Sequence, residues 1–295
     1  MLRKPGRFMI FIRLIPEKMR ILYFSDVHIE IRMEGSRTPW TDIYPLDLGP
    51  DLTGFAGQVE LAVLAGDIGT IRPRDGVSVL GYAEQVGSFL GCPVVLVPGN
   101  HEYYRGNFDL DQTALLAAKA PGVTALDRGD AFFPHSVGSL RVLGATLWTD
   151  YRCMGDQEAG MFEAWRTMND HRVIRRADGQ VFEPADALRQ HELSRAWLAR
   201  RLGEPHEGPT LIVTHHVPHS AAAHPRYGLN PSSPAFLSNC DDLIEAAVRI
   251  KAVGWIFGHH HWSHRIDLGG LRLFSAQSGY PGEHTNWHGP GVLEI

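Results

Sequence analysis

Five short apolar runs along the chain end abruptly in polar residues. The runs consist mainly of Val, Leu, Ile, Ala and aromatic residues, and Asp, Asn or His follows each one within a few positions. Continuous apolar runs of this length are typical of strands that are buried on both faces. In layered α/β folds, ligands bind at the carboxyl ends of such strands. The sequence therefore predicts one sheet edge that gathers the polar groups following residues 21–24, 61–65, 94–98, 211–214 and 255–257.

Helical patterns lie between these runs. One predicted helix has Asp75 as its N-cap and Gly91 as the residue that ends it. A second is predicted with Asp241 as its cap, and a third over residues 184–203, which begins at a proline and stops at a glycine. Strand-like runs at residues 140–147, 271–274 and 292–295 lack an intervening helix. They predict an antiparallel part, and hence a mixed sheet or two packed sheets.

The domain is expected to comprise residues 19–295. Residues 1–18 mix apolar and basic side chains without a small-residue cleavage site, so we interpret them as a poorly ordered N-terminal extension, with Met19 as an alternative start of translation. The segment 150–184 is the least strand-like and is interpreted as an insertion that caps the site. The loop 218–234 is a second candidate rim. Plain surface connections are the alternative for both segments.

Composition narrows the possible partners. The net charge is −5 and charged residues make up 21% of the chain, which argues against an extensive footprint on nucleic acid. A small phosphorylated substrate is still compatible, because metal ions can supply positive charge locally. No apolar run has the length of a membrane-spanning helix. Three scattered cysteines predict free thiols and a cytoplasmic location rather than a disulfide framework.

Seven side chains at the predicted strand ends have the chemistry of metal ligands. If the chain is extended there, side chains two residues apart point to the same side, so Asp-x-His and His-x-His can each direct a pair at one ion. A mixed nitrogen and oxygen set suits Mn²⁺, Fe or Zn²⁺. Seven ligands exceed the needs of one tetrahedral ion and suffice for two divalent ions that share a carboxylate. The seven are Asp26, His28, Asp67, Asn100, His215, His259 and His261.

This ordered series resembles the calcineurin-like metallophosphoesterase superfamily. The matching motifs are Asp26-x-His28, Gly66-Asp67, Gly99-Asn100-His101-Glu102, Thr214-His215 and Gly258-His259-x-His261. The resemblance covers the chain from about residue 20 to its end, and the segments 99–104 and 146–150 are similar to bacterial phosphoesterases of undefined substrate. It implies an α/β fold in which two mixed β-sheets pack face to face and helices flank them.

The resemblance also implies roles for single residues. A hydroxide between the two ions would attack the phosphorus of a phosphomonoester or phosphodiester, and His101 would protonate the leaving oxygen or stabilise the charge of the phosphate. Asp67 would bridge the ions and so take part in catalysis. The first ion would be held by Asp26, His28, Asp67 and His261, and the second by Asp67, Asn100, His215 and His259.

Several residues keep an alternative interpretation. His216 competes with His215 for one ligand position, while His260 is expected to have a structural role. Glu102 can orient His101 or the local turn. The segment 276–280 lacks the arginine that many relatives carry there. Residues for which substrate contact and plain packing are both open are Tyr103, Tyr104, Arg105, Asp150, Arg152 and Tyr280.

The sequence is compatible with three functions. The first is a dinuclear metal-dependent phosphoesterase. The second is a catalytically silent binding or scaffold protein with the same fold. The third is a mononuclear iron oxygenase, which needs only two His and one carboxylate. Seven filled ligand positions and His101 favour the phosphoesterase, whereas the natural substrate, the metals and the oligomeric state are not predicted.

Overall fold

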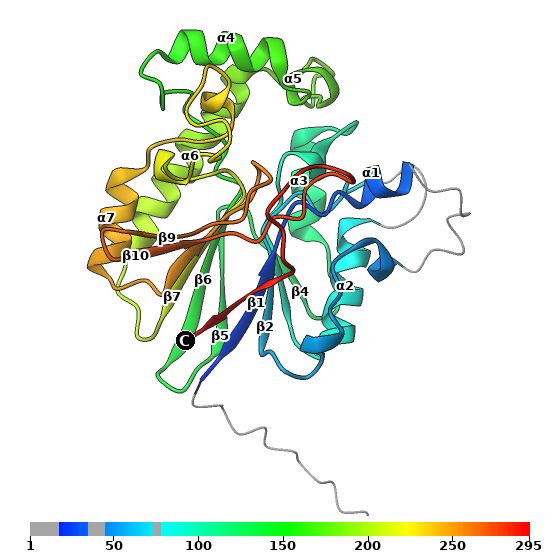
Figure 1. Cartoon of the computed structure of the whole chain (residues 1–295), viewed down its shortest axis with the longest axis vertical. Coiled ribbons are helices and arrows are strands. Elements are labelled where there is room, and N and C mark those ends of the chain that lie inside the picture. Colours follow the sequence, from blue (N-terminus) through cyan, green and yellow to red (C-terminus); the bar gives the residue numbers. More distant parts are fainter. Residues whose placement is uncertain (1–17, 35–44, 73–77) are drawn as a thin grey trace, which may run out of the picture.

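Two mixed β-sheets form the centre of the protein. The computed structural model describes residues 18–34, 45–72 and 78–295 (Figure 1). The first sheet has the order β11-β1-β2-β3-β4, in which β1 to β4 are parallel and β11 is antiparallel to β1. Its strands are β1 (Arg20–Phe24), β2 (Leu61–Leu64), β3 (Val94–Leu96), β4 (Val123–Ala125) and β11 (Gly291–Glu294).

The second sheet has the order β5-β6-β7-β8-β10-β9. Its four inner strands are parallel, and the two edge strands β5 and β9 are antiparallel to their neighbours. The mixed parallel and antiparallel arrangement of both sheets confirms the predicted fold class. The strands are β5 (Gly129–Pro134), β6 (Ser139–Ala145), β7 (Thr210–Thr214), β8 (Gly254–Ile256), β9 (Arg265–Leu268) and β10 (Leu271–Phe274).

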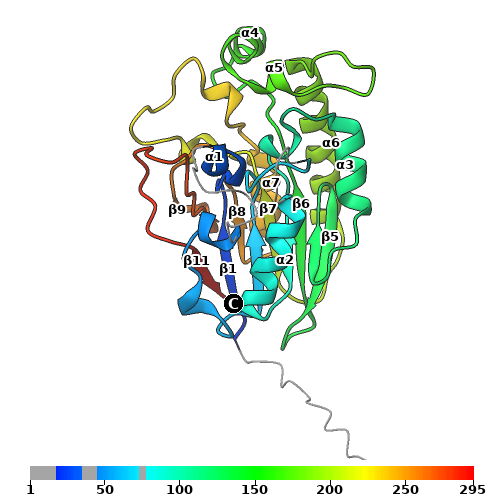
Figure 2. The same ribbon diagram turned by 90° about the vertical axis from the view of Figure 1, so that its right-hand side faces the viewer.

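Helices cover the outer faces of the two sheets (Figure 1). Short 3-10 turns, among them η4 (His101–Tyr103) and η6 (Ser233–Ala235), occur in the connections. In two views α4 and α5 lie at the end of the molecule opposite the C-terminus (Figures 1 and 2). The α-helices are α1 (Ile29–Glu34), α2 (Val79–Leu90), α3 (Phe108–Ala117), α4 (Gln157–Thr167), α5 (Asp170–Val173), α6 (Pro184–Gly203) and α7 (Asp241–Arg249).

Alternation along the central strands explains why they are apolar throughout. In β1, Leu22 belongs to the core beneath α2, whereas its neighbour Ile21 belongs to the core between the two sheets. In β2, Leu64 likewise belongs to the core beneath α2, and Val63 belongs to the core between the sheets. Both faces of these strands are therefore buried, and each such aliphatic side chain contributes about 1.5–3 kcal/mol relative to exposure.

The helix boundaries agree with the predictions in part. Helix α6 covers the predicted residues 184–203, and Gly91 ends α2 in the left-handed conformation at φ 73°. Asp75 lies outside the described residues, and Ser78 is the N-cap of α2. The prediction that Asp241 caps α7 is wrong, because Asp241 is the first helical residue. Its carboxylate accepts a hydrogen bond from His219 at 3.1 Å instead.

The ends of the described chain meet at the sheet edge. Met19 is buried, and its backbone exchanges hydrogen bonds of 2.9 and 3.0 Å with Ile295. The predicted N-terminal extension falls almost wholly on residues 1–17, which lie outside the described residues, so it stays a prediction. Within the described ranges, no helix combines the length and apolarity needed to cross a bilayer.

Candidate metal centre

The five loops that follow β1, β2, β3, β7 and β8 bring the seven predicted residues together. All seven side chains are buried in the folded chain. Three overlapping groups among the described residues have ligand atoms close enough for a shared ion. These groups are Asp26, His28 and His261; His28, Asp67 and His101; and Asp67, His215 and His259.

The first cluster of ligand atoms lies between the loops after β1 and β8. His261 Nε2 is 3.0 Å from His28 Nε2 and 3.6 Å from Asp26 Oδ1. His28 Nε2 is also 3.9 Å from Asp67 Oδ2. Two imidazole nitrogens and two carboxylates thus face one point from separate loops, which is a donor set that suits a first-row divalent ion.

The second cluster surrounds His215. Its Nε2 atom is 3.1 Å from Asn100 Oδ1, 3.1 Å from His259 Nδ1 and 3.3 Å from Asp67 Oδ2. Asp67 Oδ2 is therefore near both clusters. The other ring nitrogen of His215 is 2.9 Å from the carbonyl of Ala65, which fixes the orientation of the ring.

The backbone at the five candidate ligands other than Asn100 and His215 is left-handed rather than extended. Asp26, His28 and Asp67 have φ values of 57°, 50° and 52°, and His259 and His261 have φ values of 84° and 56°. The prediction of an extended backbone at Asp-x-His and His-x-His is therefore wrong. The side chains still converge, because each loop turns sharply after its strand. Non-glycine residues rarely adopt this region, and such residues cluster at functional sites.

Two glycines permit the close approach of these loops. Gly66 precedes Asp67 at φ 86°, and a side chain at this position would run into the ring of His215. A side chain at Gly99, which precedes Asn100, would run into the carboxylate of Asp67. The glycines in the motifs are therefore required by packing.

Glu102 joins two of the loops from inside the protein. Its buried carboxylate accepts hydrogen bonds from the backbone N–H groups of Asp67, Ile68 and Gly99 at 2.9, 2.9 and 2.6 Å. Burial raises its pKa to about 7, and the nearby charge of Asp67 acts in the same direction. Of the two predicted roles for Glu102, these contacts correspond to the one in the local turn.

His101 lies beside the two clusters. Its backbone N–H donates to Asp67 Oδ1 at 2.9 Å, and its Nε2 atom is 4.0 Å from Asp67 Oδ2. Tyr280 OH is 3.1 Å from Nε2, and Glu30 Oε1 is 2.9 Å from Nδ1. Burial alone would lower the pKa of His101, but Asp67 and Glu30 raise it to about 9. The two carboxylates therefore favour the protonated form of the imidazole.

Three carboxylates contact predicted residues and were missed by sequence reasoning. Glu30 holds His101 and lies two residues after His28, a spacing that could have identified it. Asp170 Oδ1 accepts from Asn100 Nδ2 at 2.8 Å, and Glu283 Oε2 is 2.6 Å from His261 Nδ1. Asp170 and Glu283 are distant in sequence and carry no local signal.

Two further histidines have other partners. His216 Nδ1 is 3.2 Å from the carbonyl of Thr146, and burial holds the pKa of His216 well below its ordinary value. His260 Nε2 is 2.8 Å from the carbonyl of Ala222. Neither belongs to a possible metal group among the described residues. Within the segment 276–280, the hydroxyl of Ser278 accepts a hydrogen bond from the guanidinium of Arg32 at 2.8 Å.

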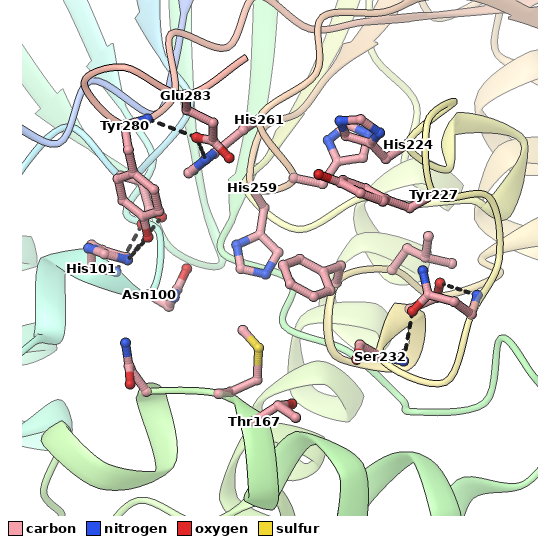
Figure 3. Close-up of a pocket in the computed structure, with 18 of the residues that line it drawn as sticks. Asn100, His101, Thr167, His224, Tyr227, Ser232, His259, His261, Tyr280 and Glu283 are labelled. Carbon is pink, nitrogen blue, oxygen red and sulfur yellow. Dashed lines mark hydrogen bonds and ion pairs between the residues drawn. The ribbon is translucent and has the colours of Figure 1, made fainter. Parts of the chain in front are cut away.

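A cavity of about 630 Å³ opens next to the clusters (Figure 3). Tyr104 and Tyr280 line it, whereas Tyr103 is buried against Phe108 and Trp148. Residues 167–169, at the end of α4 and the start of the following turn, form part of its wall, and so do residues of the segment 224–237. Both predicted rim segments thus contribute to this cavity. The idea that 150–184 is a separate insertion stays a prediction.

Comparisons with known proteins identify the family and support the fold. The family described as calcineurin-like phosphoesterase matches residues 19–263. The uncharacterized protein L509 of Acanthamoeba polyphaga mimivirus is 22% identical over 94% of this chain and 97% of its own length. The crystal structure of phosphopantetheinyl hydrolase from Mycobacterium tuberculosis superposes with a TM-score of 0.58 over 90% of this chain and 91% of that chain, at 19% identity. At this identity, the similarity concerns the fold.

Proposed function

The chain belongs to the calcineurin-like phosphoesterase family, and on this premise we propose that it hydrolyses phosphate esters with two divalent metal ions. The position of Asp67 carries the proposal. Its Oδ2 atom lies 3.9 Å from His28 Nε2 and 3.3 Å from His215 Nε2, between the two clusters of ligand atoms. A carboxylate buried between two sets of imidazoles fits a bridging ligand.

The chemistry of the donors fits the ions. Burial lowers the pKa of both His28 and His259, which favours the neutral rings that metal ligands require. Asp67 raises the pKa of His215 to about 9 and Glu283 raises that of His261, so an ion would displace a proton from each of these two rings. Nitrogen and oxygen donors together favour Mn²⁺, Fe or Zn²⁺. We assign Asp26, His28, Asp67 and His261 to one ion and Asp67, Asn100, His215 and His259 to the other.

His101 has the position of an acid catalyst, and the carboxylate of Glu30 favours its protonated form. When bound, the ions would lower the pKa of water and supply positive charge to the phosphoryl group. The protonated ring of His101 borders the cavity and can give a proton to the leaving oxygen or stabilise the charge of the phosphate. Tyr280 and Glu30 hold the ring from either side.

The substrate we propose is a small phosphorylated molecule, as either a monoester or a diester. A silent scaffold is less well supported, because all seven ligand positions and His101 are filled. An oxygenase with one iron would leave most of these ligands without a role. A cytoplasmic location stays a prediction.

The test combines metal analysis with hydrolysis. Purified protein should contain two ions per chain after loading with Mn²⁺ and should hydrolyse p-nitrophenyl phosphate or bis(p-nitrophenyl) phosphate. Asp67→Asn should abolish hydrolysis and reduce the bound metal while the circular dichroism spectrum is retained. The matched control is Asp242→Asn at an exposed position of α7. Undiminished activity of Asp67→Asn, or one iron per chain with oxygen consumption, would contradict the proposal.

A further inference from the structure

The cavity beside the candidate metal centre is much larger than a phosphate group requires. Its volume of about 630 Å³ lies in the range of pockets that enclose drug-sized organic molecules. Asp67, Asn100 and His101 form only one end of it. The other lining residues include two segments from distant parts of the chain, residues 167–169 and 224–237 (Figure 3). The outer part of the cavity therefore has room for the organic portion of a substrate.

An apolar surface extends from the metal centre along this outer part. The ring of Phe236 lies 5.0 Å from the ring of His259, so the apolar surface begins at the ligands themselves. Met168 and Leu237 also line the cavity. Tyr227 lies farther out and is 61% exposed, so its ring is available to cover a ligand.

The outer part of the cavity carries little charge. Among the described lining residues, the two segments contribute no Asp, Glu, Lys or Arg. They contribute His224, and burial lowers its pKa, which keeps it neutral at pH 7. Phosphate and carboxylate groups in ligands are usually held by Arg or Lys. Asn169 is exposed at the wall and offers both a donor and an acceptor. The other residues from these segments are Thr167, Met168, Tyr227, Gly228, Asn230, Ser232, Ser233, Phe236 and Leu237.

Resting on the proposed function, we propose that the substrate is a phosphate ester of an extended, uncharged organic group. The surface of Met168, Phe236 and Tyr227 binds the apolar part of this group, and Asn169 bonds to an amide or hydroxyl in it. The organic group, rather than additional phosphates, determines which ester is hydrolysed.

The experiment compares esters that differ only in this group. Methyl, butyl and 3-carboxypropyl groups are each offered as a phosphomonoester, followed by phosphate release, and as a p-nitrophenyl diester, followed by nitrophenolate release. The protein is the full chain loaded with Mn²⁺. The butyl ester should have a kcat/KM roughly 10-fold or more above that of the methyl ester, because pocket contacts of this size discriminate to that extent. The carboxypropyl ester, whose end is anionic, should have a kcat/KM only slightly above that of the methyl ester.

Variants locate the preference in the cavity. Tyr227→Ala and Phe236→Ala should lower kcat/KM for the butyl ester several-fold more than for the methyl ester. Tyr227 is largely exposed, so its variant keeps the fold even if Phe236→Ala does not. Phe162→Ala is the matched control, because Phe162 is 63% exposed on α4 and is absent from the described lining of the cavity.

The outcomes separate this inference from the proposed function. If no ester is hydrolysed under any metal, the phosphoesterase assignment itself fails. Two results would overturn only the inference about the organic group. One is an equal kcat/KM for the methyl and butyl esters, and the other is a kcat/KM for the carboxypropyl ester above that for the butyl ester. Equal effects of Tyr227→Ala on all three esters would also overturn it.

Discussion

Asp170 Oδ1 accepts a hydrogen bond from Asn100 Nδ2 at 2.8 Å and another from Tyr104 OH at 2.7 Å. The amide of Asn100 is thereby oriented so that its oxygen lies 3.1 Å from His215 Nε2. Asp170 is buried and belongs to α5, in the segment that the sequence suggested as a cap. A residue of this segment therefore positions a candidate ligand of the second ion.

We expect Asp170→Ala to weaken binding of one of the two ions. Loss of a partner that orients a metal ligand typically costs 10- to 100-fold in affinity. The measurement is a Mn²⁺ titration by calorimetry, with activity recovered at high Mn²⁺. Asp170→Asn, which keeps an acceptor oxygen, should be milder, and exposed Asp178→Ala is the control. Unchanged affinity in Asp170→Ala would refute the positioning role.

Glu102→Ala should destabilise the fold. The substitution removes the acceptor of four buried backbone N–H groups, those of Asp67, Ile68, Gly69 and Gly99. A buried donor without a partner costs about 1–3 kcal/mol. Urea unfolding of the metal-free protein should show a decrease of this size or more, with Glu102→Gln less affected and exposed Glu245→Ala unaffected. Wild-type stability of Glu102→Ala would mean that these hydrogen bonds do not support the loops.

The variants His101→Ala and Tyr280→Phe should lower kcat by different amounts. His101→Ala is expected to lower kcat about 10²- to 10⁴-fold, which is typical of a lost acid catalyst. Tyr280→Phe removes only the hydrogen bond of 3.1 Å to His101 Nε2 and should lower kcat several-fold. Steady-state kinetics at saturating Mn²⁺ would decide. An effect of Tyr280→Phe as large as that of His101→Ala would assign the phenol a direct part in the reaction.

Stability should fall in acid partly because of a half-buried histidine pair. Burial lowers the pKa of His260 to about 3 and that of His264 to about 4, with the rings 3.0 Å apart at their Nε2 atoms. The unfolded chain has histidines of pKa about 6.5 and so binds more protons below that pH. The free energy of unfolding therefore decreases as the pH falls from about 6.5 toward 4, by about 1.4 kcal/mol per pH unit for each group.

The variant His264→Gln tests this pH dependence. Glutamine can still hydrogen-bond to His260 but does not titrate, so the loss of stability between about pH 7 and pH 5 should be smaller than in the wild type. Urea unfolding at several pH values measures the slope. The exposed histidine His284 supplies the control variant His284→Gln. An identical slope in wild type and His264→Gln would contradict the prediction.

Local sequence was sufficient to find the apolar central strands and the seven candidate ligands, but it did not predict β4, β5 and β9. A strand such as Leu61–Leu64 is apolar on both faces, and Asp67 follows it three residues later, so neighbouring residues carry the whole signal. The glycines before Asp67 and Asn100 are also local signals, because they permit the loops to approach. The left-handed backbone at Asp26 and His261 carried no such signal, since non-glycine residues adopt it only when tertiary contacts compensate.

The sequence by itself determined the apolar central strands, the helices α2, α6 and α7, the residue types at the sheet edge and the family, because these depend on periodicity and on short motifs. Only the tertiary structure decided that Asp170 holds Asn100, that Glu283 holds His261, and that residues 167–169 and 224–237 share one cavity. These contacts join residues that are far apart along the chain. Their formation depends on how the two sheets and the helices around them pack, and no local pattern records that packing.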